Sequence, residues 1–220
     1  MFISRIHLDP RRRGTKQAMA NPNHFHAHIQ KVLSREIGAT PADDGERPLW
    51  RMERGGSRPT LYVVSRTRPD LSLTQRQYGS PDSPPEYHDY TKRLDTLERG
   101  QVWSFRLVAN PTHNIERKTD GKVIRIEHRV AKFQSEWLGR KGDRHGFSVL
   151  GEPVISSLAT SRFQRRDAET ENATVKIASC VFAGRLEVTD PDKFREALMY
   201  GVGRARAYGC GLLTIAPVSR

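Results

Sequence analysis

The C-terminal part of the chain contains the segment Gly201-Val202-Gly203-Arg204-Ala205-Arg206-Ala207-Tyr208-Gly209-Cys210-Gly211-Leu212-Leu213. Four glycines and two arginines lie here between an expected helix and an expected strand. Glycine adopts positive φ and lets a ligand approach the backbone, and arginine matches the geometry of phosphate. The segment lacks the Gly-Lys-Ser/Thr ending of a Walker loop, and its helix-first order differs from the dinucleotide fingerprint, in which a strand comes first. It therefore predicts an anion-binding loop, with a plain turn as the alternative.

The chain is strongly basic. Its 37 lysines and arginines outnumber its 25 aspartates and glutamates, which gives the 220 residues a formal net charge of +12. Most of the excess is arginine, whose planar guanidinium suits phosphate and guanine better than an ammonium does. This balance predicts a polyanionic partner, with a solvated basic surface that has no partner as the alternative.

Membrane, metal and cofactor signals are weak. No apolar stretch approaches the roughly 18 residues that span a bilayer, and Met1–Leu8 contains Arg5 and His7 where a signal peptide needs apolar residues. The spacing of Cys180 and Cys210 fits neither a zinc site nor a redox motif, and the acidic residues form no cluster for magnesium. We expect a cytoplasmic protein with two buried free thiols and without a membrane partner, metal or small-molecule cofactor.

The N-terminal half alternates strand and helix signals. A strand is expected over Phe2–Leu8, where apolar and polar residues alternate. Asn21-Pro22 is typical of a helix start. Apolar residues follow it at helical spacing, namely Phe25, Ile29, Val32 and Leu33. Further strands are expected at Leu49–Glu53 and Leu61–Ser65, and the proline-rich stretch 68–86 is expected to be a long excursion or a mobile loop.

The middle of the chain repeats this mixture. Val102–Val108 alternates as a strand and is followed by a polar connector over 112–122. After a short strand at Val123–Ile126, a helix is expected in which Val130, Phe133 and Trp137 share an apolar face.

Toward the C-terminus, extended segments are expected at Phe147–Ile155 and Thr174–Val188. Asp190-Pro191 is typical of the start of a second short helix. Phe194, Ala197 and Leu198 are expected to face inward, and Leu212–Ala216 to form a last strand. The whole pattern predicts an α+β fold of two tandem ferredoxin-like domains with antiparallel sheets, at 1–111 and 121–220.

Three histidines cluster at the start of the first expected helix, at 24, 26 and 28. At 100° per residue, His26 lies beside the apolar stripe, whereas His24 and His28 turn away from it. RNA carries its own nucleophile, the 2′-hydroxyl, so one imidazole and nearby cations are enough to cleave it. A satisfied histidine without catalytic function is the alternative.

A second basic stretch, Arg162-Phe163-Gln164-Arg165-Arg166, precedes a turn-like acidic segment and a strand. It predicts one arm of a basic hairpin that contacts RNA at a stem end or beside a loop, with a solvated hairpin tip as the alternative. Basic residues on or just after the preceding helix could form one positively charged surface with this hairpin. They are Lys132, Arg140, Lys141 and Arg144.

Together these features resemble the CRISPR-associated CasE family, the repeat-cleaving endoribonuclease subunit of type I-E Cascade complexes. The resemblance covers essentially the whole chain and keeps the order of the motifs. Besides the first strand and the Asn-Pro helix start, they are Phe-Arg-Leu-x-Ala-Asn-Pro at Phe105–Pro111, Phe-x-Gly-x-Leu-x-Val at Phe182–Val188, and the glycine-rich ending at Gly201–Pro217. The last motif is the most specific.

The resemblance implies metal-independent cleavage at the base of the repeat stem-loop, with a 2′,3′-cyclic phosphate and a 5′-hydroxyl as products. It also implies two partners, the CRISPR repeat RNA stem-loop and the other Cascade subunits, since family members generally keep the cleaved stem-loop. A catalytically inactive scaffold that binds the same stem-loop is one alternative. A metal-dependent nuclease built on His24 and His28 is another.

Mapped from Asn21-Pro22, the histidine of the family falls on His26. The family often has tyrosine three residues earlier, where this chain has Asn23, so Asn23, His24 and Lys31 are candidates to replace it. Lys31 lies about 140° around an ideal helix from His26 and is a candidate phosphate contact. Arg165 and Arg166 fall on the groove-reading hairpin. The remaining expected RNA contacts are Arg162, Gly201, Gly203, Arg204, Arg206, Gly209 and Gly211.

Overall fold

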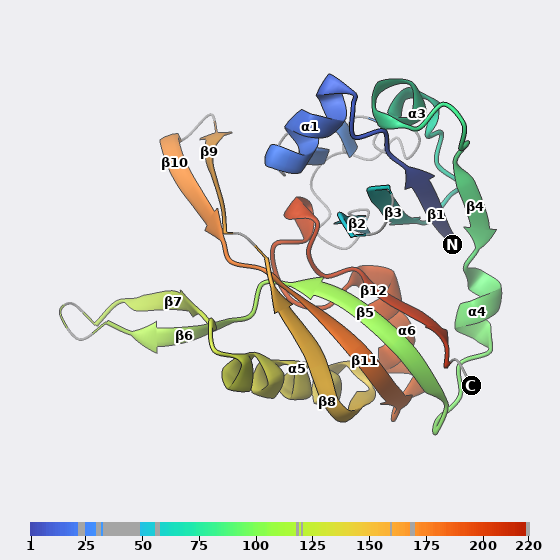
Figure 1. The fold of residues 1–220 in the computed structure, drawn as a ribbon. Helices are drawn as coiled ribbons and strands as arrows, with labels where there is room; N and C mark the ends of the chain where they lie inside the picture. Colours follow the sequence, from blue (N-terminus) through green and yellow to red (C-terminus); the bar gives the residue numbers. More distant parts are fainter. Residues whose placement is uncertain are drawn as a thin grey trace.

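The computed structural model describes residues 1–21, 25–29, 32, 49–55, 58–117, 119, 121–158, 160–167 and 170–218, with the backbone alone at 164–167 and 170–173. Figure 1 shows two layered α+β domains connected through the short helix α4 (Thr91–Asp95). This confirms the expected fold class of two ferredoxin-like domains with antiparallel sheets.

The first domain has the βαββαβ order of a ferredoxin-like fold. Its elements are β1 (Phe2–His7), α1 (Arg13–Ala20), the helical residues 25–29 and 32, β2 (Leu49–Glu53), β3 (Thr60–Ser65), α3 (Ser72–Tyr78) and β4 (Glu86–Asp89). The strands are antiparallel in the order β2-β3-β1-β4. Helix α1 is additional to the βαββαβ order.

Strand β3 of the first sheet is buried on both faces. On the helix-covered face, Phe25 and Ile29 pack in one apolar cluster with Leu61 and Val63 of β3. On the other face, Val64 joins the core of the second domain. A strand buried on both faces needs apolar residues at successive positions, which explains the run of apolar residues in β3.

The second domain repeats the βαββαβ order and carries two inserted hairpins, β6–β7 and β9–β10 (Figure 1). Its elements are β5 (Val102–Ala109), β6 (Thr112–Glu116), β7 (Val123–Glu127), α5 (Ala131–His145), β8 (Phe147–Ser157), β9 (Ser161–Asp167), β10 (Thr170–Ile177), β11 (Cys180–Val188), α6 (Pro191–Tyr200), the 3₁₀ turn η1 (Arg206–Tyr208) and β12 (Leu213–Pro217). The main sheet is antiparallel in the order β12-β5-β11-β8.

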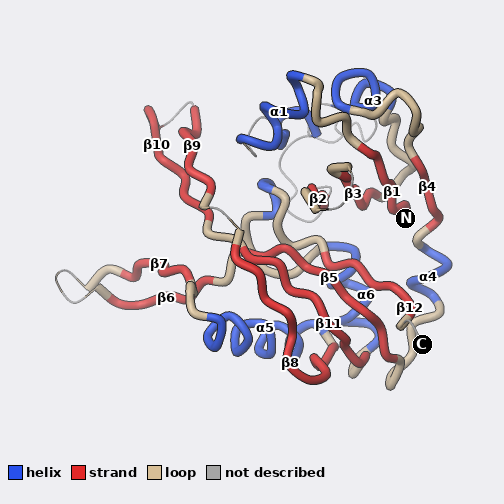
Figure 2. Tube along the Cα trace, viewed as in Figure 1, coloured by secondary structure: helices blue, strands red, loops and turns tan. Residues whose placement is uncertain are grey.

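Helices α5 and α6 cover one face of this second sheet (Figure 2). Trp137 of α5 stacks on Phe182 of β11, with ring centroids 5.9 Å apart. Phe194 and Leu198 of α6 are fully buried in the same core. The Asp190 side chain caps α6 by accepting from the Lys193 N–H, which confirms the predicted helix start and its inward face.

A buried arginine connects the two sheets. Arg51 of β2 is 2% exposed, and its guanidinium donates to the carbonyl oxygens of Arg106 and Leu212 and to the Thr214 hydroxyl in the second domain. It also pairs with Glu53 at 2.6 Å. The domains therefore share a polar contact as well as an apolar core.

Several segments differ from the sequence-based expectations. The stretch 68–86 is not one long loop, because α3 forms within it and buries Leu71 and Thr74. The expected connector over 112–122 contains β6, which pairs with β7. Helix α1 was not expected at all. Trp137 of α5 is buried as expected, but Phe133 of α5 and Val130, which directly precedes the helix, are 47% and 56% exposed.

Strand pairing also indicates where the boundary between the expected domains at 1–111 and 121–220 lies. β5 lies before residue 111, yet its hydrogen-bonded neighbours are β11 and β12 of the second sheet. Judged by strand pairing, the second domain begins with β5. No helix in the described part of the chain is long and apolar enough to cross a membrane.

Candidate nucleic-acid interface

His26 lies at the junction of the two domains. The neighbouring Phe25 is fully buried and holds the helix through ring contacts with Trp50 at 5.1 Å and with Tyr78 at 5.2 Å. His26 itself is partly exposed, and its ring centroid lies 5.7 Å from that of Tyr208 in the glycine-rich loop. The structure thus places His26 beside the apolar stripe, as expected, and directs it toward the second domain.

His28 is buried, although its position at 100° per residue predicted that it turns away from the apolar stripe. It is only 8% exposed, its Nε2 lies 3.0 Å from the Thr74 Oγ1, and its ring packs edge-on against Tyr78 at 4.6 Å. Helix α3 covers this side of the helical residues 25–29, so the prediction that His28 turns away from the core was wrong. His24, Asn23 and Lys31 lie outside the described residues, and their assignments stay predictions.

The glycines of the C-terminal loop serve close packing. Their φ angles are positive, at +83° for Gly201, +87° for Gly203, +81° for Gly209 and +90° for Gly211. A Cβ at position 209 would lie 2.8 Å from the Trp50 ring, and one at 203 would lie 3.0 Å from Trp137. Larger side chains would therefore separate the loop from both domains.

Most backbone donors of this loop are used inside the protein. The Gly201 N–H donates to Ala197, the Gly209 N–H to Arg206 and the Gly211 N–H to Val108. RNA contact by these three glycines would therefore not use their N–H groups. The exposed side chains of Arg204 and Arg206 are the cationic groups that the loop presents.

The sequence alone does not mark Tyr208 as a functional residue. Its ring lies between two others, 5.7 Å from His26 and 4.9 Å from Phe163 at the base of the β9–β10 hairpin. It therefore connects the helical residues 25–29, the glycine-rich loop and the β9–β10 hairpin. In the sequence, Tyr208 stands out only as the one aromatic residue of the glycine-rich loop. Its function could not be predicted from this, because its contacts with His26 and Phe163 form only in the folded protein.

The expected basic hairpin is present as β9–β10. Arg162 faces Lys176 across the pair and is exposed, while Phe163 and Ile177 are buried at its base. Arg165 lies opposite Ala173 in the backbone register. The side chains of Arg165 and Arg166 lie outside the described part, so their RNA contacts stay predictions.

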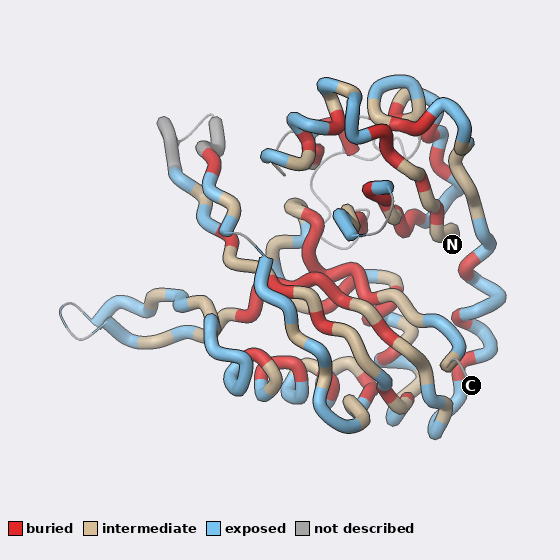
Figure 3. The backbone as a smooth tube through the Cα atoms, in the orientation of Figure 1, coloured by how far each residue is buried: buried red, intermediate tan, exposed pale blue. Residues whose placement is uncertain are grey.

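Two hollows lie beside the hairpins β6–β7 and β9–β10, which both project from the second domain (Figure 3). The larger, about 780 Å³, is lined by the base of both hairpins together with Arg204 and Tyr208. The second, about 380 Å³, is strongly basic. Five cationic side chains line it, namely Arg125, Arg140, Lys141, Arg144 and Arg204.

The charge in the second hollow affects Lys141. Burial lowers its pKa, and Arg144, Arg204, Arg206 and Arg140 lower it further. None of the described residues that line this hollow is acidic. An anion is the ligand that such a surface favours.

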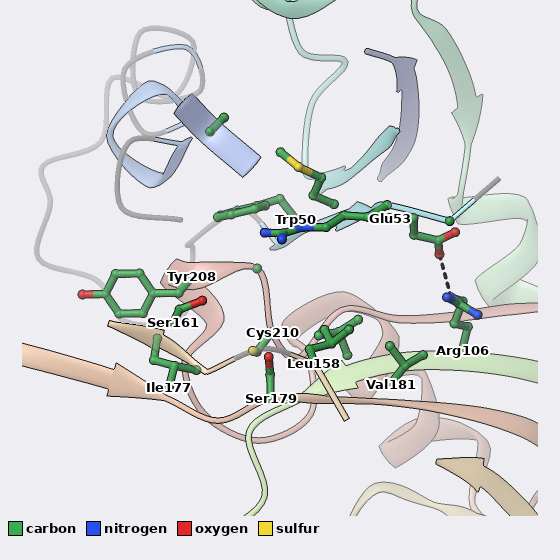
Figure 4. Close-up of a pocket in the computed structure, with 16 residues that line it drawn as sticks. Trp50, Glu53, Arg106, Leu158, Ser161, Ile177, Ser179, Val181, Tyr208 and Cys210 are labelled. Atoms are coloured by element: carbon green, nitrogen blue, oxygen red, sulfur yellow. Dashed lines mark ion pairs between the residues drawn. The ribbon is translucent and has the colours of Figure 1, made fainter. Parts of the chain in front are cut away.

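A third, smaller hollow lies between the two domains (Figure 4). Trp50 and Tyr208 line it from opposite domains, and an ion pair of 3.1 Å between Glu53 and Arg106 lies at its far end. It shares Tyr208 with the groove between the hairpins, which in turn shares Arg204 with the basic hollow. Neighbouring hollows thus have lining residues in common, and the series of three, called the track below, runs from Tyr208, which lies beside His26, to α5.

Tandem ferredoxin-like domains with a basic track and a projecting basic hairpin define a nucleic-acid-binding protein. The chain belongs to the CRISPR associated protein family, whose sequence model matches residues 1–217.

Two relatives carry specific names. The chain is 32% identical over 225 residues to the CRISPR-associated endoribonuclease Cse3 of Thermus thermophilus, covering 99% of this chain and 100% of that protein. It is 29% identical over 136 residues to the CRISPR system Cascade subunit CasE of Escherichia coli, covering 58% of this chain and 65% of that protein.

Solved structures agree with this assignment. Thermus thermophilus Cse3 bound to an RNA that represents a pre-cleavage complex has a TM-score of 0.75 and 30% identity, covering 98% of each chain. The Cas6e protein of Escherichia coli has a TM-score of 0.67 over 99% of this chain, and at 20% identity it supports the fold alone.

Proposed function

We propose that the protein is a metal-independent endoribonuclease that cleaves CRISPR repeat stem-loops in precursor RNA and stays bound to the product as a subunit of Cascade. One observation carries this proposal. A relative that is 32% identical over the whole chain is a CRISPR endoribonuclease, and the same fold has been solved with a pre-cleavage RNA. His26 and the basic track supply the chemistry that this reaction needs.

In this mechanism the 2′-hydroxyl beside the scissile linkage attacks its own phosphate. The P–O5′ bond breaks, and the products carry a 2′,3′-cyclic phosphate and a 5′-hydroxyl. His26 moves a proton at the reacting atoms, a role worth roughly 10²–10⁴ in rate. Cationic side chains stabilise the charge that develops on the phosphate oxygens. We assign Lys31 to such a phosphate contact. We assign Asn23, at the position where the family often has tyrosine, to the catalytic site around His26.

The stem of the RNA lies along the track in this proposal. Arg162, Arg165 and Arg166 of the β9–β10 hairpin contact the stem end, where the groove is accessible. Arg204 and Arg206 present charge from the glycine-rich loop, between the hairpin and His26. Gly201, Gly203, Gly209 and Gly211 shape the loop that holds these arginines in place.

We also place the protein in the cytoplasm. Cys180 and Cys210 are both free and buried, as the sequence analysis expected. Free thiols persist in the reducing cytosol, which fits this location.

The His26→Ala variant tests the proposal. With the repeat RNA of its own genome and in the presence of EDTA, wild type is expected to cleave and His26→Ala to be slower by at least about 100-fold, at unchanged RNA affinity. The exposed His88 on β4 offers a matched control, and His88→Ala should cleave like wild type.

Three results would contradict the proposal in different ways. Wild-type cleavage by His26→Ala would remove His26 from the chemistry. Loss of wild-type cleavage in EDTA would favour a metal-dependent reaction. Tight stem-loop binding without a cyclic-phosphate product under any condition would favour the catalytically inactive scaffold.

A further inference from the structure

We propose that Tyr208 is a second catalytic residue, whose hydroxyl gives a proton to the 5′-oxygen leaving group while His26 takes the proton of the 2′-hydroxyl. This inference rests on the proposed function and adds a proton donor to it. Cleavage needs both transfers, because the attacking oxygen loses a proton and the departing oxygen gains one. A single imidazole that acts as the base leaves the second transfer without a donor.

The position of Tyr208 beside His26 is the first support. The two ring centroids are 5.7 Å apart and the ring planes are inclined by 58°, so the residues are in direct contact across the domain junction. Both residues are partly exposed. At this separation the polar ends of both side chains can reach a single phosphodiester linkage through hydrogen bonds of ordinary length.

The backbone around Tyr208 is held firmly. The Tyr208 N–H donates to the Ala205 carbonyl at 2.9 Å, and Ala205 has a positive φ of 59° although it is not glycine. The following Gly209 packs on Trp50 so closely that no side chain fits. On its other side the Tyr208 ring lies against Phe163. A proton donor has to be held in this way, because catalysis depends on its exact position.

Tyr208 also lies where the substrate is expected to pass. It lines both the hollow between the domains, shown in Figure 4, and the groove between the two hairpins. No other described residue that lines both hollows carries an ionisable side chain, since the one shared neighbour is Ile177. An RNA strand that runs from the hairpins toward His26 therefore passes Tyr208.

The proton transfers balance. A bond forms between the 2′-oxygen and phosphorus, and the bond between phosphorus and the 5′-oxygen breaks. The 2′-hydroxyl proton goes to the His26 imidazole, and the Tyr208 hydroxyl gives its proton to the 5′-oxygen. The His26 imidazolium then returns a proton to the phenolate, and both side chains regain their starting states without any other reactant.

The test is single-turnover cleavage by Tyr208→Phe, a change that keeps the ring and its contacts. On the natural RNA we expect a loss of about 100-fold in rate, at unchanged affinity for an uncleavable 2′-deoxy RNA. A second RNA carries sulfur in place of the scissile 5′-oxygen. A thiolate leaves without being protonated, so on this RNA Tyr208→Phe should cleave within about threefold of wild type.

Two further variants separate the outcomes. Tyr200→Phe, on α6, is a matched control and should match wild type on both RNAs. His26→Ala should be slow on both. A wild-type rate for Tyr208→Phe on the oxygen linkage, or an equal loss on both linkages, would overturn the role of Tyr208 while the endoribonuclease itself stands. If wild type cleaves neither RNA, the proposed function and this inference fall together.

Discussion

Arg51 illustrates how much one side chain contributes to the arrangement of the two domains. Its guanidinium is buried and donates to two carbonyl groups and a hydroxyl of the second domain. Arg51→Met keeps most of the volume but removes these buried hydrogen bonds and one of the two arginine partners of Glu53, whose other partner is Arg106. We expect the free energy of unfolding to fall by about 3 kcal/mol, measured by urea denaturation.

The exposed pair of Arg129 with Glu127 provides the control. Its ion pair, 3.1 Å long, involves a side chain that is 60% exposed. Arg129→Met is expected to cost less than about 1 kcal/mol, since water screens and replaces the interaction. Equal losses in the two variants would show that Arg51 does not hold the domains together.

The two cysteines make stability depend on pH. Burial raises the pKa of both Cys180 and Cys210 to about 12. Thiols of an unfolded chain ionise near about pH 8.5, so above that pH the unfolded state binds fewer protons than the folded one. The free energy of unfolding is therefore unaffected by these thiols below about pH 8.5 and falls as the pH rises toward 12.

Urea denaturation at several pH values tests this dependence. Between about pH 8.5 and 10, each cysteine should contribute a loss that approaches about 1.4 kcal/mol per pH unit. A variant with Cys180→Ala and Cys210→Ala should show a correspondingly flatter slope, whatever its absolute stability. Parallel pH dependences for the variant and wild type would contradict the prediction.

Among the larger elements, α5 carries the basic hollow at the end of the track. Arg140 and Arg144 line it, away from His26. Cations that neutralise duplex phosphates release counterions, so log K falls with log salt by about 0.9 per phosphate. The double variant Arg140→Gln/Arg144→Gln should therefore flatten the salt slope of stem-loop binding by about two units, while the cleavage rate of bound RNA is kept.

The matched control for α5 lies on the opposite side of the molecule. Lys92 of α4 is exposed and distant from the hairpins (Figure 1). Lys92→Gln removes one positive charge without touching the track and should leave the slope unchanged. An unchanged slope in the α5 variant as well would place the stem elsewhere.

The two hairpins show which elements the sequence could predict. The β9–β10 hairpin was expected, because a dense run of arginine precedes a turn-like segment. β6 was missed, because both faces of its hairpin meet solvent and no apolar alternation is required of it. Helix α3 was missed for the opposite reason, since the nearby prolines suggested a loop although none of them lies inside the helix.

For the molecule as a whole, the length of the track predicts slow product release. Contacts along the stem stay intact when the linkage at its base is cut, so the product should bind as tightly as the substrate. With RNA in excess we therefore expect a burst of one product per protein followed by very slow turnover. Raising the salt concentration should restore turnover. Steady cleavage beyond the first equivalent at low salt would contradict this expectation.

Local patterns were enough to predict the fold class, most strands, the capped start of α6 and the place of His26. These features depend on neighbours in the chain, through periodicity, capping and turn chemistry. The burial of His28, the bridge made by Arg51 and the contact of Tyr208 with His26 depend on residues that are far away in sequence. No local pattern encodes them, because each partner is brought into contact only when the sheets and helices pack.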